Sequence, residues 1–122
     1  MRVPYEYAII QACPRIERGE VINVGVLLYC QRRDFLAGRT LLHAERLLAV
    51  DPGADLAGIR AALTAWETTC TGDGVTHAMS PCERFRWMVA PRSTILRAGP
   101  VHMGLAEDPD AELDRLVALL VH

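Results

Sequence analysis

Four of the thirteen basic residues of this chain lie in one segment, residues 80–102, with the sequence SPCERFRWMVAPRSTILRAGPVH. All four are arginines, whose guanidinium group is a planar, permanently charged donor that suits carboxylates and phosphates. Arg92 and Ser93 directly follow Pro91, so a backbone turn there could donate several hydrogen bonds to one anion. The segment is therefore a candidate anion- or partner-binding site, with the proposed residues Arg84, Arg86, Arg92, Ser93 and His102. The alternative is that its arginines are separate surface charges in salt bridges with acids such as Glu83.

Catalysis has less support than binding in this segment. His102 is its only histidine and the one side chain there that could transfer a proton near neutral pH, although a structural or exposed histidine is the simpler interpretation. Ser80 is accounted for as a helix cap, and Ser93 lacks the Gly-x-Ser-x-Gly context of a nucleophile. We assign no catalytic residue, and the sequence leans away from an enzyme.

Asn23 and Gly25 interrupt an otherwise apolar run. Residues two apart in a strand share a face, so the amide beside a missing side chain would form a small polar recess for a ligand group or a loop. The alternative is a helix backbone that packs closely over Gly25 and hydrogen-bonds to Asn23. Glu17 and Glu20 could add oxygen ligands for a hard cation, but a solvated hairpin with internal ion pairs is the simpler interpretation.

The chain before this segment is predicted to form three strands, at residues 5–13, 21–30 and 34–43. Their short connections indicate an antiparallel meander, because a parallel crossover needs a dozen or more residues. A fourth short strand is predicted at residues 94–97, where a β-branched run ends before Gly99 and Pro100.

Three helices are predicted, near residues 53–70, 80–90 and 108–121. Asp51 would cap the first, which buries a stripe that includes Trp66, and Ser80 and Glu83 form a capping box for the second. The core side of the third carries Leu113, Leu116, Val117 and Leu120. The expected fold class is α+β, an antiparallel four-stranded sheet covered by about three helices, in a single domain of residues 1–122.

The composition narrows the class of protein further. A net charge of −2 argues against a general nucleic-acid binder, and the apolar runs are too short to span a membrane. The sequence opens without a secretory signal, so we expect a cytoplasmic protein. The four cysteines match no zinc pattern and are expected to be buried free thiols, and no metal or cofactor is predicted. The hydrophobic content of 51% is slightly high, and a homodimer could use the surplus.

Three segments carry a long joint pattern: YEYAIIQACPRIERGEVINVGVLLYC at 5–30, LLAVDPGADL at 47–56, and ERFRWMVAPRSTILRAGPVHMGLAEDPDAELDRL at 83–116. Through these segments the chain resembles, over its full length, the bacterial domain-of-unknown-function family DUF3037. The positions that match the family pattern are Glu20, Asn23, Gly25, Arg84, Arg86, Trp87, Pro91, Arg92, Ser93, Pro100, His102 and Gly104.

The resemblance implies a small bacterial protein, and the family brings no established activity with it. Its members are often encoded beside a HipA-like kinase, which implies an accessory role with such a kinase as a candidate partner. The leading hypothesis is a non-catalytic binding module that presents residues 84–102 and the Asn23 and Gly25 face to a protein partner. The alternative is an enzyme or sensor that binds a phosphate- or carboxylate-bearing small molecule through its arginines, with His102 as acid-base group.

Overall fold

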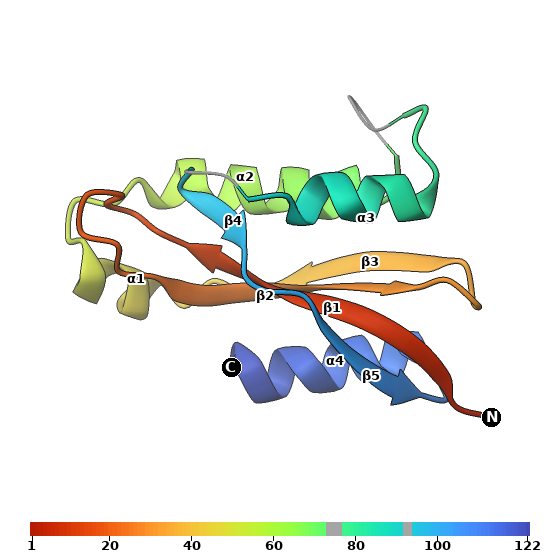
Figure 1. Cartoon of the computed structure of the whole chain (residues 1–122). Helices are drawn as coiled ribbons and strands as arrows, with labels where there is room; N and C mark the ends of the chain where they lie inside the picture. Colours follow the sequence, from red (N-terminus) through yellow and green to blue (C-terminus); the bar gives the residue numbers. More distant parts are fainter. Residues whose placement is uncertain (73–76, 92–93) are drawn as a thin grey trace.

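The computed structural model describes residues 1–72, 77–91 and 94–122 and contains an antiparallel sheet with helices on both faces (Figure 1). The α+β prediction is confirmed, with one strand and one helix more than the sequence indicated. The strands are β1 Val3–Ala12, β2 Ile22–Cys30, β3 Phe35–Thr40, β4 Leu96–Ala98 and β5 His102–Ala106. The helices are α1 Ala44–Val50, α2 Leu56–Thr69, α3 Pro81–Val89 and α4 Pro109–Leu120.

Strand β1 is the organising strand of the sheet. The order is β3-β2-β1-β4, and β5 also pairs with β1. Residues Ile10–Ala12 of β1 pair with β4, and residues Val3–Tyr7 pair with β5, so two short strands share one side of a long strand. The first three strands form the predicted meander, with β1 and β3 on either side of β2.

The sheet is covered on both faces, by α2 and α3 on one face and by α4 on the other (Figure 1). We name these the α2–α3 face and the α4 face. Because β2 lies between two helical layers, its residues from Val24 to Cys30 are all buried, which explains the continuous apolar run of this strand. The core therefore consists of two apolar clusters, one on each face of the sheet.

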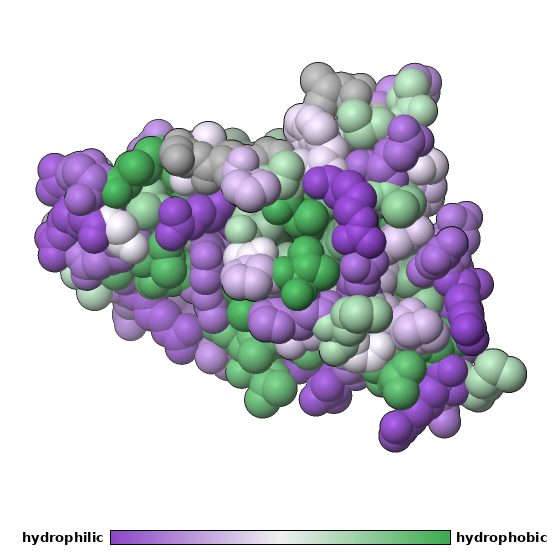
Figure 2. Space-filling view, viewed as in Figure 1, coloured by the Kyte–Doolittle hydropathy of each residue, from purple (hydrophilic) through white to green (hydrophobic). Residues whose placement is uncertain are grey.

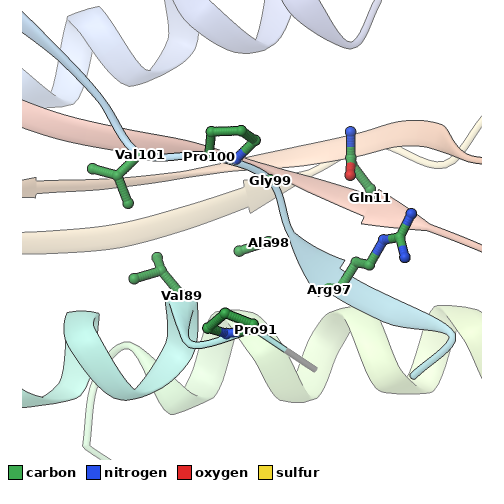
Figure 3. A pocket seen from close by; sticks show the side chains of 8 residues that line it. All are labelled: Gln11, Val89, Pro91, Arg97, Ala98, Gly99, Pro100 and Val101. Atoms are coloured by element: carbon green, nitrogen blue, oxygen red, sulfur yellow. The ribbon is translucent and has the colours of Figure 1, made fainter. Parts of the chain in front are cut away.

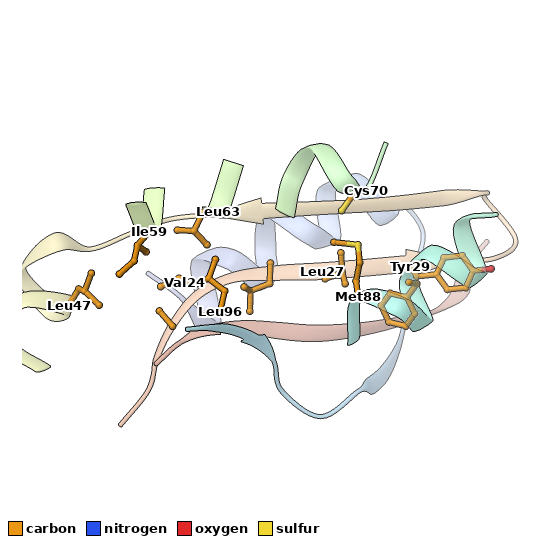
Figure 4. Packing of buried hydrophobic residues seen from close by; sticks show 12 residues of the cluster. Val24, Leu27, Tyr29, Leu47, Ile59, Leu63, Cys70, Met88 and Leu96 are labelled. Atoms are coloured by element: carbon orange, nitrogen blue, oxygen red, sulfur yellow. The ribbon is translucent and has the colours of Figure 1, made fainter. Parts of the chain in front are cut away.

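From Val26 to Cys30, alternate residues of β2 belong to the two clusters. Leu27 and Tyr29 lie in the cluster under α2 and α3 (Figure 4). Phe85 of α3 stacks on the Tyr29 ring with a centroid distance of 5.4 Å. Val26 and Leu28 face α4. The core side predicted for the last helix is confirmed, since Leu113 and Leu116 are buried and Val117 and Leu120 pack against the same cluster. Trp66 is half-buried, as predicted.

The helix starts follow their capping residues. Ser80 and Glu83 form the predicted capping box of α3, with the Glu83 N–H donating to Ser80 Oγ over 3.2 Å and the Ser80 N–H to Glu83 Oε1 over 3.1 Å. The prediction that Asp51 caps α2 is wrong, because Asp55 is the cap and accepts a hydrogen bond from the Gly58 N–H. Asp51 instead follows α1, a helix that the sequence analysis did not predict, and accepts from the Gly53 N–H.

The hairpin between β1 and β2 carries local ion pairs, Arg15 with Glu17 and Arg18 with Glu20. All four cysteines are free thiols, but the expectation of burial is wrong for Cys82, which is exposed on α3. No helix in the described ranges is long and apolar enough to cross a membrane.

Candidate functional site

The guanidinium group of Arg84 is committed to the join between α2 and α3. Its Nη1 donates to the Cys70 carbonyl and its Nη2 to the Met79 carbonyl, each over 2.8 Å. Gly72 makes room for this arrangement, because a Cβ there would lie 2.8 Å from Arg84 Nη2. Carbonyl groups near a helix C-terminus lack hydrogen-bond donors within the helix. Arg84 supplies a donor to such a carbonyl at the end of α2, and its second bond, to Met79, lies just before the start of α3.

Arg86 is engaged on the α2–α3 face. Its Nη2 lies 2.9 Å from Glu6 Oε1 and 2.7 Å from Glu6 Oε2, and its guanidinium carbon lies 5.2 Å from the centre of the Phe85 ring. The hydrogen bond that Arg86 donates to Glu6 raises the pKa of the Arg86 guanidinium. Arg86 therefore ties α3 to β1 in an ion pair that is partly exposed to water.

His102 lies on the opposite face of the sheet from Arg86. His102 is paired with Tyr7 and Met103 with Glu6, and residues paired across a sheet share a face. The exposed His102 ring contacts the Tyr7 ring on the α4 face, with a centroid distance of 5.3 Å. The structure thus does not bring His102 and Arg86 together in one place.

Asn23 and Gly25 are separated by a β-bulge. Gly25 pairs with Ile10 but Asn23 pairs with Gln11, so Val24 is an extra residue in β2. The prediction that the period of two gives them a common face fails for this reason. Asn23 points to α4, where its Nδ2 donates to the Leu120 carbonyl over 3.1 Å, in line with the alternative that Asn23 satisfies a helix backbone.

Gly25 is required by the close approach of a neighbouring strand rather than of a helix. A Cβ at this position would lie 2.7 Å from the Arg39 carbonyl oxygen of β3 and 3.2 Å from Ile10 Cδ1. The carbonyl belongs to the sheet backbone and has little freedom to move. In the described part of the chain, neighbouring atoms therefore fill the space where a recess at Gly25 was expected.

We expect Gly25→Ala to lower the free energy of unfolding by about 1–3 kcal/mol, the usual cost of overpacking a core. Gly38→Ala is the matched control on β3, because the atoms nearest to its Cβ would be Cys70 Sγ at 3.4 Å, Leu27 Cδ1 at 3.7 Å and the Val26 carbonyl oxygen at 3.8 Å. Urea unfolding of both variants measures the difference. Equal stabilities of the two variants would show that the strands can part at Gly25 without cost.

Arg92 and Ser93 lie outside the described residues, so their proposed role stays a prediction. On either side of them, Pro91 and Arg97 line a hollow of about 430 Å³ between the end of α3 and the link from β4 to β5 (Figure 3). Val89 and Val101 also line this hollow from opposite sides, and the Arg97 side chain extends beside Gln11 (Figure 3).

The outer edge of β5 is a feature that the sequence analysis missed. The Gly99 N–H donates to the Ile9 carbonyl over 2.8 Å, so odd-numbered residues of β1 direct their backbone groups toward β4 and β5. It follows that His102, Gly104 and Ala106 bond to β1, whereas Met103 and Leu105 direct their N–H and C=O groups outward. No other strand in the described part of the chain pairs with this edge.

The side chains of this edge are apolar and exposed. Met103 is 74% and Leu105 58% exposed, and Val101 just before the strand is also exposed. Apolar groups are visible among polar ones on the face of the molecule where β4 and β5 lie (Figures 1 and 2). Strand edges in soluble proteins are usually protected by charge, proline or a covering element, and β5 itself carries no Asp, Glu, Lys or Arg.

The opposite edge of the sheet, β3, is protected. Glu67 of α2 accepts hydrogen bonds from the Thr40 N–H over 2.9 Å and from the Thr40 hydroxyl over 2.6 Å. Arg39 of β3 is held by Asp110 and Asp114 of α4. Among the described residues, the edge at β5 is therefore more accessible to another chain than the edge at β3.

A family model for a protein of unknown function, DUF3037, matches residues 7–121. The chain belongs to the DUF3037 family. No curated protein and no solved structure matches it. Because the match covers nearly the whole chain, β5 and its outer edge are part of the DUF3037 domain.

In this DUF3037 domain, the Tyr5 side chain of β1 lies over Gly104 of β5 and bonds to α4 on the α4 face. The Tyr5 hydroxyl donates to Glu112 Oε2 over 2.5 Å, and Arg115 donates to both Glu112 oxygens over 2.7 and 2.8 Å. Burial, and then the hydrogen bond to Glu112, raise the pKa of Tyr5 to about 12. Gly104 is needed beneath this side chain, because a Cβ there would lie 2.5 Å from the Tyr5 hydroxyl oxygen.

A sequence signal for β5 does exist. Val101, Met103 and Leu105 alternate with less apolar residues between Gly99-Pro100 and Glu107-Asp108, the pattern of a strand with one apolar face. A strand with this pattern is usually expected to bury its apolar face in the core.

Proposed function

We propose that this protein is a non-catalytic binding module that presents the outer edge of β5 to an extended segment of a protein partner. The observation that carries the proposal is the open edge, with outward backbone groups at Met103 and Leu105 and exposed apolar side chains. Unpaired N–H and C=O groups at strand spacing are matched best by another strand.

An added strand would also place side chains beside a hollow on the α2–α3 face. This hollow has a volume of about 230 Å³ and is lined by Met103 of β5, by Glu6 and Tyr29 of the two central strands, and by Arg32. In strand addition, backbone bonds supply affinity and such hollows select alternate side chains. The partner segment is therefore expected to be extended, with apolar residues at alternate positions to cover Met103 and Leu105.

The family context suggests a HipA-like kinase as the partner, and we retain it as the first candidate to test. The anion-binding alternative has less support, because the guanidinium groups of Arg84 and Arg86 already bond within the chain. Protein binding at β5 needs neither of them to be released.

Immobilised protein should recover a stoichiometric partner from lysate of the native host, and variants of β5 should weaken its capture. Met103→Pro removes the outward N–H without touching the bonds to β1, and Leu105→Lys adds a charge to the edge. We expect each to weaken binding at least about tenfold, equivalent to about 1.4 kcal/mol.

Leu119→Lys is the matched control, because Leu119 is an apolar side chain on α4 with 66% exposure and lies outside β5. It should bind as wild type does, and thermal unfolding should show that all variants are folded. Capture that survives both β5 variants would move the binding surface away from this edge. Recovery of the free protein alone would contradict the binding-module proposal.

A further inference from the structure

A groove of about 830 Å³ lies beside α2 and the chain that leads into β4, away from the β5 edge. It is lined by four segments that are distant in the sequence: the loop after β1, the turn between α1 and α2, one side of α2, and residues 94–96. Its volume is in the range of sites for small organic ligands.

The groove is hollow because of the residues that α2 presents to it. Gly58 and Ala62 are one helical turn apart, and their small size leaves space beside the helix. Trp66, one helical turn beyond Ala62, also lines the groove. Ile16 and Ile95 stand at the groove with 50% and 45% exposure, although both are large and apolar. An apolar ligand would remove these side chains from water.

Two carboxylates lie at the turn between α1 and α2. Asp51 Oδ1 accepts from the Gly53 N–H over 3.1 Å, and Asp55 Oδ1 accepts from the Gly58 N–H over 3.0 Å. Each carboxylate keeps a second oxygen, and neither forms an ion pair with any residue of the described ranges. The described lining contains no basic side chain, so the polar end of the groove is negative.

We propose that this groove binds an organic cation with an apolar body, of the arylalkylamine class. The ammonium group lies beside Asp51 and Asp55, and the apolar body lies against Ile16, Ile95 and Trp66. The negative end selects a cation over an anion of the same shape, and the apolar walls supply affinity. This site is separate from β5 and does not depend on the proposed function.

Three probes of the same shape test the charge preference by calorimetric titration: phenylbutylamine, phenylbutanol and phenylbutanoate. We expect the amine to bind at least about tenfold more tightly than the carboxylate, a difference of about 1.4 kcal/mol. In the double variant Asp51→Asn, Asp55→Asn, the amine should bind only as well as the alcohol. Asparagine can accept both backbone hydrogen bonds through its Oδ1, so this variant removes the charges without removing these bonds.

Asp108→Asn is the matched control, because Asp108 caps α4 in the same way, through a hydrogen bond from the Asp110 N–H, and does not line the groove. It should leave all three affinities unchanged. Ile95→Ser should weaken all three probes together, and an unchanged affinity would place the ligand elsewhere. Equal affinity for amine and carboxylate, or no binding of the amine at millimolar concentration, would overturn the proposal.

Discussion

Phe85→Ala is expected to lower the free energy of unfolding by about 3–5 kcal/mol, the usual cost of removing a fully buried aromatic side chain. Phe85 is completely buried, stacks on Tyr29 of β2, and lies beneath the Arg86 guanidinium. Its loss would leave a cavity between α3 and the sheet. Urea denaturation followed by circular dichroism measures the change.

Trp87→Ala provides the comparison on the same helix. Trp87 is two residues further along α3 and is 40% exposed, so truncation should cost much less than at Phe85. If the two variants lost the same stability, α3 could not be packed on the sheet through Phe85 as the structure has it.

Arg84→Met is expected to lower the free energy of unfolding by about 2–4 kcal/mol. Hydrogen bonds to a charged group contribute about 1.5–3 kcal/mol each, and this change leaves the Cys70 and Met79 carbonyls without their donor. Methionine keeps much of the side-chain volume, so the loss reports the hydrogen bonds rather than a cavity.

Arg86→Met is the control, because it removes the same charge from the same helix. The Arg86 side chain is 52% exposed, and exposed ion pairs contribute about 1 kcal/mol or less. Thermal and urea unfolding should therefore separate the two variants clearly. A tolerated Arg84→Met would mean that the bonds to the Cys70 and Met79 carbonyls contribute little to stability and do not oppose a ligand-binding role for Arg84.

The layout of the fold could be predicted where local signals were unambiguous. The capping box at Ser80 and Glu83 defined the start of α3, and the apolar run of β2 identified a buried strand. The start of α2 was misplaced because Asp51-Pro52 and Asp55 are both good start signals. Only the position of α1, which ends just before Asp51, decides between them.

The candidate site was less predictable because its residues act through partners distant in the sequence. Arginine spacing indicates a charged segment, but the carbonyls that bind Arg84 belong to Cys70 and Met79, and the carboxylate that binds Arg86 belongs to Glu6. The bulge at Val24 likewise reverses the face of Asn23 without any local marker. Alternation in β5 was visible, but sequence alone does not show that its apolar side faces solvent.

The pairing of β1 with β4 and β5 has a consequence for the order of folding. The strands β1, β2 and β3 are neighbours in the sequence and can pair early. Val3 of β1 can pair with Ala106 of β5 only later, because the two residues are far apart in the chain. Pairing between such distant residues closes a long loop and is slow. We therefore expect a nascent intermediate whose exposed edge is β1.

Arrival of residues 96–106 seals that edge and creates a new one at β5. The exposed edge during synthesis is therefore β1, which would promote aggregation. In the finished fold the exposed edge is β5. A partner that recognises β5 would consequently distinguish mature molecules from incompletely folded ones.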